Sequence, residues 1–551
     1  MNGKIAEKVG DVKIYGMGLL GGKGEGLVKI NECQIPGAHK LRTRVLTTEF
    51  YDYYLNNGEK FGKEELETIS NILETLENIP ISVRSSATNE ACLTPGSSGS
   101  VHAGENTSFM LPNNHPDFSV RFQQLIQSIY FIYKDFAQNQ PLNCNEKMAI
   151  VINPIPGIYD ETLAGSVYYP LISGVANSFF PYALKSQRPE DGFARIAFGH
   201  GYATVIDDFE VISMATIKEP IPFNLMGDGQ MFFYAIDLSK NESLNGHELE
   251  TMKKLHTRFS TSKYINLLGR NKEKITFEKL ISENRFGFKS GLLEIMDTIA
   301  KNISTQFQIE FVFNFEKING EEAGRFHVVQ LTQLPEQKFE KIQIPNQVKH
   351  TYLSIKNLQG HGIKKDLCQV IVVSPFIYSK EKRDIVRSKI AKMNKEMKQR
   401  NENYILIVPG RLGSNNPEWG IQIEYREVDG AAAIFEYGVD IAGRAEPVKE
   451  DSNLTGGIYG SHFLYMIQGG DDEEEKRLQT RVYGTQGTHF LTNLVSNNVI
   501  YGFITPNEDL FDPWLFKAPN PNEPVYLLKF PERVNIYADS NNQNCVVVSE
   551  N

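Results

Sequence analysis

The strongest constraint on the fold is the alternation of apolar and polar residues between positions 307 and 335. In FQIEFVFNF (307–315) every second residue is apolar. After a polar connection with two glycines, a partner strand RFHVVQLTQLP (325–335) would place Phe326, Val328, Gln330 and Thr332 on one face. A period of two residues is typical of a strand with one buried face. We therefore predict an antiparallel hairpin in which the carboxylate of Glu310 and the amide of Gln330 meet above the sheet.

The first 150 residues combine helical and strand-like patterns. Apolar residues recur every three or four positions through 63–79, and Pro80 then ends the predicted helix. A second helix is predicted over about 118–136. Strands are predicted at ISVRSS (81–86) and at the wholly apolar MAIVI (148–152). This mixture predicts an α+β fold.

The chain becomes polar between about 341 and 365, and we interpret this stretch as a linker. It divides an N-terminal domain, 1–340 with subdomains of about 1–225 and 226–340, from a mixed α/β C-terminal domain at 366–551. The second domain begins with a helix near 380–400 that carries nine Lys or Arg against three acids. No aromatics interleave, so a solvated face is preferred to an anion or nucleic-acid surface.

Charge and composition narrow the class of protein. The net charge of −10 argues against a protein whose main function is to bind the phosphate backbone of a nucleic acid. We therefore expect no nucleic-acid partner. The five cysteines form no CxxC pair, which fits a reducing compartment. The N-terminal residues lack an apolar signal region and no stretch reaches about 18 apolar residues. We expect a cytoplasmic protein with no membrane partner.

Two segments have the composition of phosphate-binding loops. GGKGEGL (21–27) predicts a Gly-rich turn whose backbone N–H groups approach an anion closely, with Lys23 adding a positive charge. VRSSAT (83–88) offers Arg84 and three hydroxyls. GGKG is not a P-loop, and a Gly-rich turn alone is more often only a tight loop. PGRLGS (409–414) is a further strand-then-glycine turn that could bind an anion or be a plain turn.

Taken together, these segments resemble the nucleotide-binding domain of the phosphoenolpyruvate synthase and pyruvate phosphate dikinase family. The order GGKGEGL, VRSSAT, MAIVI, IEF (309–311) and Gln330 carries the resemblance. It is closer still to a bacterial phosphoenolpyruvate synthase-like group that lacks the pyruvate barrel. The segments shared with that group are FMLPNNHPD (109–117), EKMAIVI (146–152), RPEDG (188–192), PGRLGS and QGTHFLTNL (486–494).

The resemblance implies an ATP-grasp-like N-terminal domain, with ATP and Mg²⁺ as cofactors and a phosphoryl acceptor that stays unknown. It implies that Lys23 and Arg84 contact phosphates and that His200 faces ATP, these three being the candidate catalytic residues. Glu310 and Gln308 are the candidate metal ligands. The positions implied to complete the cofactor site are Gly21, Gly22, Glu90, Met148, Ile150, Ile152 and Gln330.

Two departures from the family pattern leave three functions open. Gln308 stands where the family has an acid, and Thr332 where it has Arg. An amide weakens Mg²⁺ binding, and the lost Arg removes a bidentate phosphate contact. We expect an ATP-dependent phosphotransferase. The alternatives are a catalytically silent nucleotide-binding regulatory protein and an ATP-grasp ligase that acts through an acyl-phosphate.

The family's other domains have no clear counterpart in this sequence. The residues after 340 are fewer than the roughly 250 of a TIM barrel, so the pyruvate barrel is not expected here. No phosphohistidine motif is recognisable around His462 or His489, which lie in a short repeated G-[ST]-H-F-L pattern. A buried or capping histidine is the commoner use of such residues.

Overall fold

In the computed structural model, the protein divides into two compact units with the main break between Glu336 and Gln337. We call these the N-terminal and C-terminal units, and the predicted boundary near 340 lies close to this break. The structure describes residues 7–36, 38, 40–88, 107–139, 145–162, 165–179, 189–205, 213–214, 230–242, 251–260, 262, 264–271, 273–318, 321–334, 341–345, 347–374, 378–410, 412–413, 420–437, 490, 493–494, 497–504, 509–539, 542 and 544–550.

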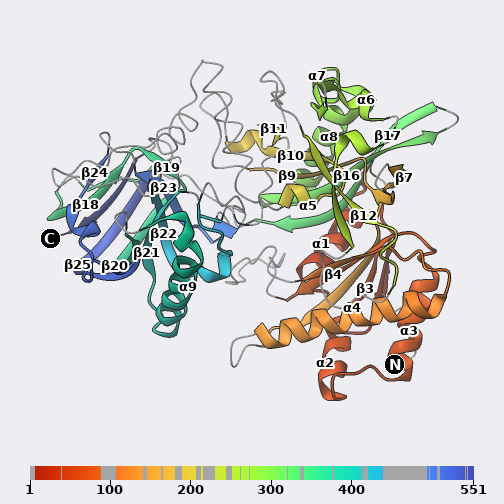
Figure 1. The fold of residues 1–551 in the computed structure, drawn as a ribbon, viewed down its shortest axis with the longest axis horizontal. Coiled ribbons are helices and arrows are strands. Elements are labelled where there is room, and N and C mark those ends of the chain that lie inside the picture. Colours follow the sequence, from red (N-terminus) through yellow and green to blue (C-terminus); the bar gives the residue numbers. More distant parts are fainter. Residues whose placement is uncertain are drawn as a thin grey trace. The chain divides into compact units, whose positions relative to one another are not determined.

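The first layer of the N-terminal unit is a six-stranded sheet, which we call sheet A, with one face covered by helices (Figure 1). Its strands, in spatial order, are β1 (Glu7–Val9), β2 (Val12–Tyr15), β3 (Arg44–Leu46), β6 (Met148–Pro154), β4 (Ile81–Ala87) and β5 (Ser108–Leu111). The helices are α2 (Thr48–Asn56), α3 (Lys63–Glu74) and α4 (Phe118–Asn139). These bounds confirm the predicted helices and strands of this region.

The core of this layer forms because the apolar stripes of the helices meet the apolar face of the sheet. Ile72 of α3, Ile129 of α4 and Val83 of β4 are all 0% exposed and belong to one cluster. A helix with apolar residues every three or four positions can bury only one face, and sheet A supplies the complementary surface.

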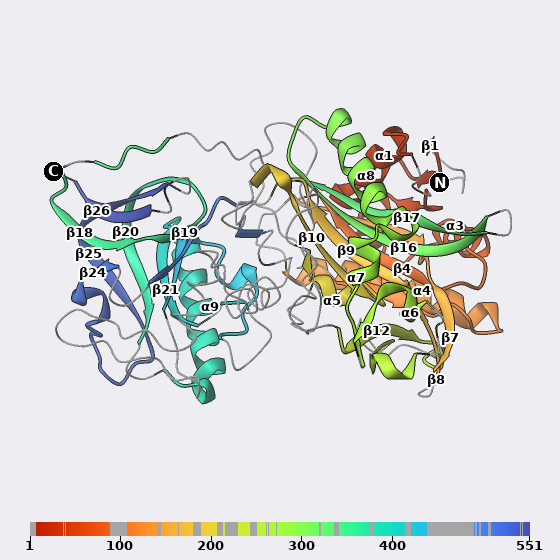
Figure 2. The same cartoon turned by 90° about the horizontal axis from the view of Figure 1, so that it is seen from above.

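The second layer is a five-stranded sheet, sheet B, which contains the predicted hairpin (Figure 2). Its spatial order is β11 (Ser213–Met214), β10 (Phe193–Phe198), β9 (Ile172–Asn177), β16 (Phe307–Ile318) and β17 (Glu321–Gln333). A four-stranded sheet, sheet C, has the order β13 (Met252–His256), β12 (Phe232–Asp237), β8 (Gly165–Tyr169) and β7 (Ile158–Thr162). The remaining elements are α5 (Tyr202–Val205), α6 (Ile265–Leu268), β14 (Arg270–Asn271), β15 (Lys274–Ile275) and α7 (Glu278–Ser282).

One face of sheet B is aromatic and is covered by helix α8 (Phe288–Asn302). The Phe288 ring lies 5.1 Å from Phe313 and 5.5 Å from Phe326, measured between ring centroids. Aromatic pairs at such distances stabilise beyond the area that they bury. The apolar half of the predicted alternation therefore faces α8, which leaves the polar half on the opposite face of the sheet.

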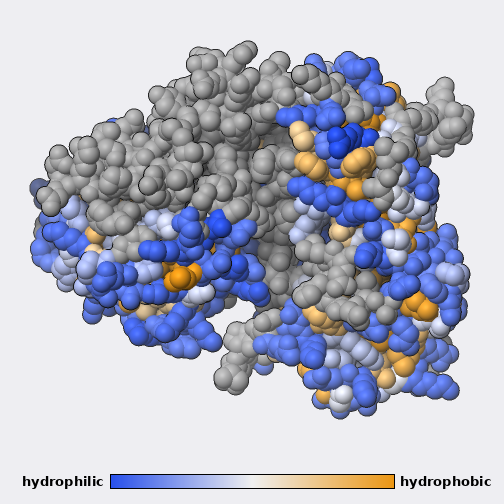
Figure 3. Space-filling model, viewed as in Figure 1, coloured by the Kyte–Doolittle hydropathy of each residue, from blue (hydrophilic) through white to orange (hydrophobic). Residues whose placement is uncertain are grey.

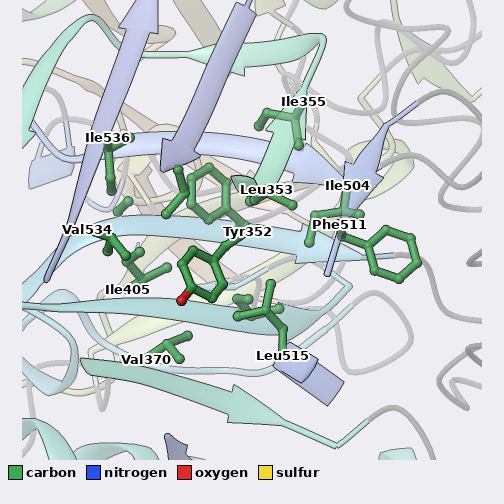
Figure 4. Close-up of a cluster of buried hydrophobic side chains, with 14 of the residues drawn as sticks. Tyr352, Leu353, Ile355, Val370, Ile405, Ile504, Phe511, Leu515, Val534 and Ile536 are labelled. Carbon is green, nitrogen blue, oxygen red and sulfur yellow. The ribbon is translucent and has the colours of Figure 1, made fainter. Parts of the chain in front are cut away.

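The C-terminal unit is built on a nine-stranded sheet. In spatial order its strands are β19 (Asn357–Gln359), β23 (Ile500–Ile504), β22 (Ala431–Tyr437), β21 (Tyr404–Pro409), β20 (Gly362–Val373), β25 (Val525–Asp539), β26 (Asn544–Ser549), β18 (His350–Ile355) and β24 (Leu510–Phe511). Strands β20 to β23 are parallel, and α9 (Arg383–Gln399) connects β20 to β21. The core that includes Tyr352, Val370 and Ile536 lies on one side of this sheet (Figure 4).

The C-terminal unit corrects one prediction and supports another. The stretch 341–365, predicted as a linker, includes the strands β18 and β19 of the nine-stranded sheet. The basic helix is α9, and its cations Arg387, Lys389 and Lys398 form ion pairs with acids of the same unit. These pairs agree with the interpretation of a solvated face.

The described surface is mainly hydrophilic on the face drawn in Figure 3, with hydrophobic residues in small groups. Within the described parts of the chain, no helix combines the length and apolar character needed to cross a membrane. Of the two repeated G-[ST]-H-F-L segments, only Phe490 belongs to the described residues, and His462 and His489 lie outside them.

Candidate functional site

The predicted hairpin contains a β-bulge at the place where Glu310 and Gln330 meet. Glu310 pairs with Gln330, and the next residue, Phe311, pairs with Val328, so Val329 is the extra residue of β17. A bulge re-aims the side chains that follow it. It leaves Val328 on the aromatic face and turns Gln330 to the polar face beside Glu310. The pairing of these two side chains was predicted, whereas the bulge was not.

Arg84 joins the two sheets at this bulge. Its Nη2 donates to Glu310 Oε2 at 2.8 Å and to Gln330 Oε1 at 2.5 Å, and its Nη1 donates to the carbonyl of Val329 at 3.3 Å. The side chains of Arg84 and Glu310 are only 14% and 15% exposed. Charge-assisted hydrogen bonds in such surroundings are strong, so the guanidinium is held in one orientation.

The position of Arg84 follows from the alternation of strand β4. Val83 and Ala87 pack in the core beneath the helices, so Arg84 and Ser86 project from the opposite face. Ser86 Oγ donates to the carbonyl of Leu20 at 2.8 Å and accepts from the N–H of Gly24 at 3.1 Å. This polar face of β4 therefore contacts the segment GGKGEGL.

GGKGEGL was predicted as a Gly-rich turn, and that prediction is wrong because the segment forms the first two turns of helix α1 (Gly21–Glu32). Its glycines allow close packing. A Cβ on Gly21 would lie 1.9 Å from the carbonyl oxygen of Ser86 in sheet A, and one on Gly26 would lie 2.1 Å from that of Leu331 in sheet B. Helix α1 thus bridges the two sheets that supply Arg84 and Gln330. Gly22 is buried in its first turn, where Lys23 is half-buried.

The two departures from the family pattern lie opposite each other. Gln308 and Thr332 are cross-strand partners, two register positions along the hairpin from Glu310 and Gln330 and on the same face. Gln330 Nε2 donates to Thr332 Oγ1 at 2.9 Å, and Gln308 is 3% exposed. The two positions at which the sequence departs from the family that it resembles therefore form one cross-strand pair, and both side chains of that pair are neutral.

His200 lies near this cluster in a loop with fixed hydrogen bonds. Its N–H donates to the carbonyl of Tyr234 at 2.7 Å, and its ring Nδ1 accepts from the N–H of Tyr202 at 3.2 Å. Burial and the Arg84 cation lower its pKa to about 4, and the Glu310 carboxylate opposes that shift. The imidazole is therefore neutral at pH 7 with its proton on Nε2, because Nδ1 is an acceptor.

The structure does not bring every implied residue to this cluster. Met148, Ile150 and Ile152 are 0% exposed in the core of sheet A, so we do not include their side chains in the proposed site. Glu90 lies outside the described residues. In the PGRLGS turn, the N–H of Gly410 donates to Tyr437 O and that of Leu412 to Glu436 Oε1. These two N–H groups are engaged within the protein, next to a carboxylate that opposes anion binding.

The donor atoms at the cluster suit only a loosely held metal ion. Among the described residues, no group of three or more His, Cys, Asp or Glu side chains is arranged to hold a metal. The oxygen donors are the carboxylate of Glu310 and the amides of Gln308 and Gln330. Mg²⁺ takes one or two carboxylates and completes its shell with phosphate and water. These residues therefore fit an ion that arrives with a phosphate ligand.

Two polar residues of sheet B were missed by the sequence analysis. Arg195 is 1% exposed and is aligned with Glu310 through Val175, so its side chain lies on the polar face of the sheet. Asn177 is aligned with Gln308 on the same face. A single Arg in the apolar strand FARIAF (193–198) was a signal for the first, because a buried cation in a strand needs polar surroundings.

The comparisons with known proteins add no assignment. No protein-family model matches the chain, and no curated protein matches it.

Proposed function

We propose that the chain is an ATP-dependent phosphotransferase with an ATP-grasp-like N-terminal unit, acting on an acceptor that stays open. The observation that carries the proposal is Arg84, which is held between two sheets by Glu310, Gln330 and the bulge carbonyl of Val329. A half-buried, oriented guanidinium is a bidentate receptor for phosphate oxygens. Catalysis of phosphoryl transfer depends mostly on such positioning and on neutralisation of charge.

Each residue has a distinct role in this proposal. Arg84 binds phosphate oxygens, and Lys23 adds a second cation at the positive end of the α1 helix dipole. Glu310, whose Oε2 accepts from Arg84, would ligate Mg²⁺ beside the phosphates. His200 donates from Nε2 as a neutral group. Bound Mg²⁺ supplies neutralisation of the charge on the phosphates.

The hydrogen bond to the His200 ring argues against a role of this histidine as a phosphoryl acceptor on Nε2. A histidine that accepts a phosphoryl group on Nε2 needs a free electron pair on that nitrogen. In His200 the acceptor nitrogen is Nδ1, which is engaged by the N–H of Tyr202, and the proton therefore sits on Nε2. We accordingly propose His200 as a hydrogen-bond donor to the ligand.

A second candidate function is a catalytically silent, nucleotide-binding regulatory protein. The neutral cross-strand pair Gln308 and Thr332 favours it, because both charged groups of the family pattern are missing at one place. In that case ATP stabilises the fold through mass action without being consumed. The two candidates share the binding site and differ only in turnover.

Calorimetric titration of Mg·ATP, together with ADP formation from α-labelled ATP, tests both candidates. We expect the wild-type protein to bind Mg·ATP and Arg84→Met to weaken binding about 10- to 100-fold, the loss of one or two charge-assisted hydrogen bonds. Arg121→Met is the matched control, since Arg121 is a buried arginine of helix α4 that contacts Asn113 and Phe118. ADP formation supports the transferase, and binding without turnover supports the silent protein. Absence of adenine nucleotide binding refutes both.

A further inference from the structure

Asn177 carries a buried acceptor atom that no described residue satisfies. The residue ends strand β9, is 7% exposed and shares a sheet face with Phe193 on one side and Gln308 on the other. Within the described parts of the chain, no donor reaches Asn177 Oδ1. A buried polar atom without a partner costs free energy comparable to a lost hydrogen bond. The position of Asn177 therefore calls for an explanation other than folding stability.

Asn177 belongs to a row of neutral polar groups across three strands. Asn177, Gln308 and Thr332 are successive cross-strand partners on β9, β16 and β17, and we call them the uncharged row. Directly opposite residues of antiparallel strands are about 4.5 to 5.5 Å apart between Cα atoms. The three side chains are thus close enough to contact one ligand group together.

The uncharged row is connected to the proposed phosphate receptor. Thr332 Oγ1 accepts from Gln330 Nε2 at 2.9 Å, and Gln330 Oε1 accepts from Arg84 at 2.5 Å. The neighbouring row on the same face contains Arg195 and Glu310 and is therefore charged. A ligand whose phosphates bind Arg84 is accordingly expected to extend from the charged row over the uncharged one.

The chemistry of the row determines which part of a ligand it accepts. It holds no cation, and burial of a charged group beside neutral amides and a hydroxyl costs far more than burial of a neutral group. Asn177 Oδ1 is an acceptor, so its complement is a donor. The ligand group must therefore be both neutral and a hydrogen-bond donor. ATP has three such groups: the 6-amino group and the 2′- and 3′-hydroxyls.

We propose that Asn177 determines nucleotide specificity by accepting a hydrogen bond from one uncharged donor of the bound nucleotide, within the subsite formed by the uncharged row. The inference rests on the proposed nucleotide site. It assigns Asn177 to recognition of the nucleoside, while Arg84 holds the phosphates.

The test compares nucleotides that each lack one donor. Binding of Mg·ATP, Mg·ITP, Mg·2′-dATP and Mg·3′-dATP is measured by calorimetry on the wild-type protein and on Asn177→Leu, an apolar variant of similar size. We expect the wild type to bind one of the three analogues about 3- to 10-fold more weakly than ATP, the range of one neutral hydrogen bond. The analogue affected identifies the donor. Asn177→Leu is expected to bind that analogue and ATP equally.

Stability supplies a second readout. Without nucleotide, Asn177→Leu should raise the melting temperature, because it removes the unsatisfied acceptor, and Mg·ATP should then raise it less than in the wild type. Tyr133→Phe is the control, since the Tyr133 hydroxyl is also buried without a described partner but lies in the core under sheet A. It should stabilise equally and leave nucleotide preference unchanged. If Asn177→Leu does not fold, Asn177→Ala removes the same acceptor without added bulk.

The outcomes separate this inference from the proposed function. A wild-type protein that binds no Mg·ATP refutes the proposed site. A protein that binds Mg·ATP but keeps the same preference among the four nucleotides in Asn177→Leu, or in Asn177→Ala if that variant is used, refutes the role of Asn177 alone. Equal affinity of the wild type for all four nucleotides also refutes it.

Discussion

Introducing opposite charges at Gln308 and Thr332, as in the family that the sequence resembles, tests whether the two positions act as one pair. Gln308 is 3% exposed and lies two residues before Glu310 on the same strand face. Gln308→Glu therefore places a second carboxylate about 7 Å from the first along the strand. At an effective dielectric of about 20, the repulsion at that distance is about 2 kcal/mol, and burial of the new charge adds to it. We expect a loss of about 2–4 kcal/mol in unfolding free energy at pH 7.

The partner substitution is costly for a different reason. Thr332→Arg removes the hydroxyl that accepts from Gln330 Nε2, with a loss of about 1 kcal/mol. In the double variant the new Arg faces the new Glu, so the two penalties should not add. We expect a favourable coupling of about 1–3 kcal/mol.

Urea unfolding of the wild type, both single variants and the double variant at pH 7 gives the coupling directly. A coupling within about 0.5 kcal/mol of zero, the usual limit of additivity, would refute the cross-strand arrangement. The same four proteins test function. If the double variant gains ATP hydrolysis that the wild type lacks, the silent candidate is supported; ATP consumption by the wild type excludes it.

Three further predictions follow from single sites. Because the His200 pKa of about 4 lies below the usual 6.5, unfolding free energy is fully retained above pH 6.5 and falls between pH 6.5 and 4, by at most about 1.4 kcal/mol per unit. His200→Gln should remove that slope in urea titrations, and an unchanged slope contradicts the assignment. Gly26→Ala should cost about 1–3 kcal/mol, because its Cβ would lie 2.1 Å from Leu331 O, and Gly24→Ala should cost less. Tyr133→Phe should add about 1 kcal/mol in the same measurement, and destabilisation would show that the hydroxyl is satisfied.

The sequence was sufficient to predict those helices and strands in which the spacing of apolar residues shows which face is buried. The alternation through 307–315 and the helical spacing through 63–79 each predict one buried face, and the structure confirms both elements. The pairing of Glu310 with Gln330 was also predictable, because both lie on strands of one hairpin. The aromatic face covered by α8 follows from the same alternation.

Other features depend on tertiary contacts that leave no local pattern. The bulge at Val329 is a single extra residue. The adjacent Val328 and Val329 mark a shift in the phase of the apolar residues, but adjacent valines are also usual in a regular buried strand. GGKGEGL looks like a loop because glycine disfavours helices, yet Gly21 and Gly26 are needed where α1 touches two sheets. The contact of Arg84 with the bulge joins residues 245 positions apart, which no local rule anticipates.

The distance along the chain between the parts of the site has a consequence for biosynthesis. Arg84 and Gln330, in hydrogen-bond contact, are separated by 246 residues. At about 5–20 residues per second, a ribosome makes Gln330 roughly 12–50 s after Arg84. Throughout that interval a nascent chain has strand β4, which carries Arg84, without strand β17, which carries Gln330. A ligand that needs Arg84 and Gln330 together can therefore bind only after strand β17 has left the ribosome.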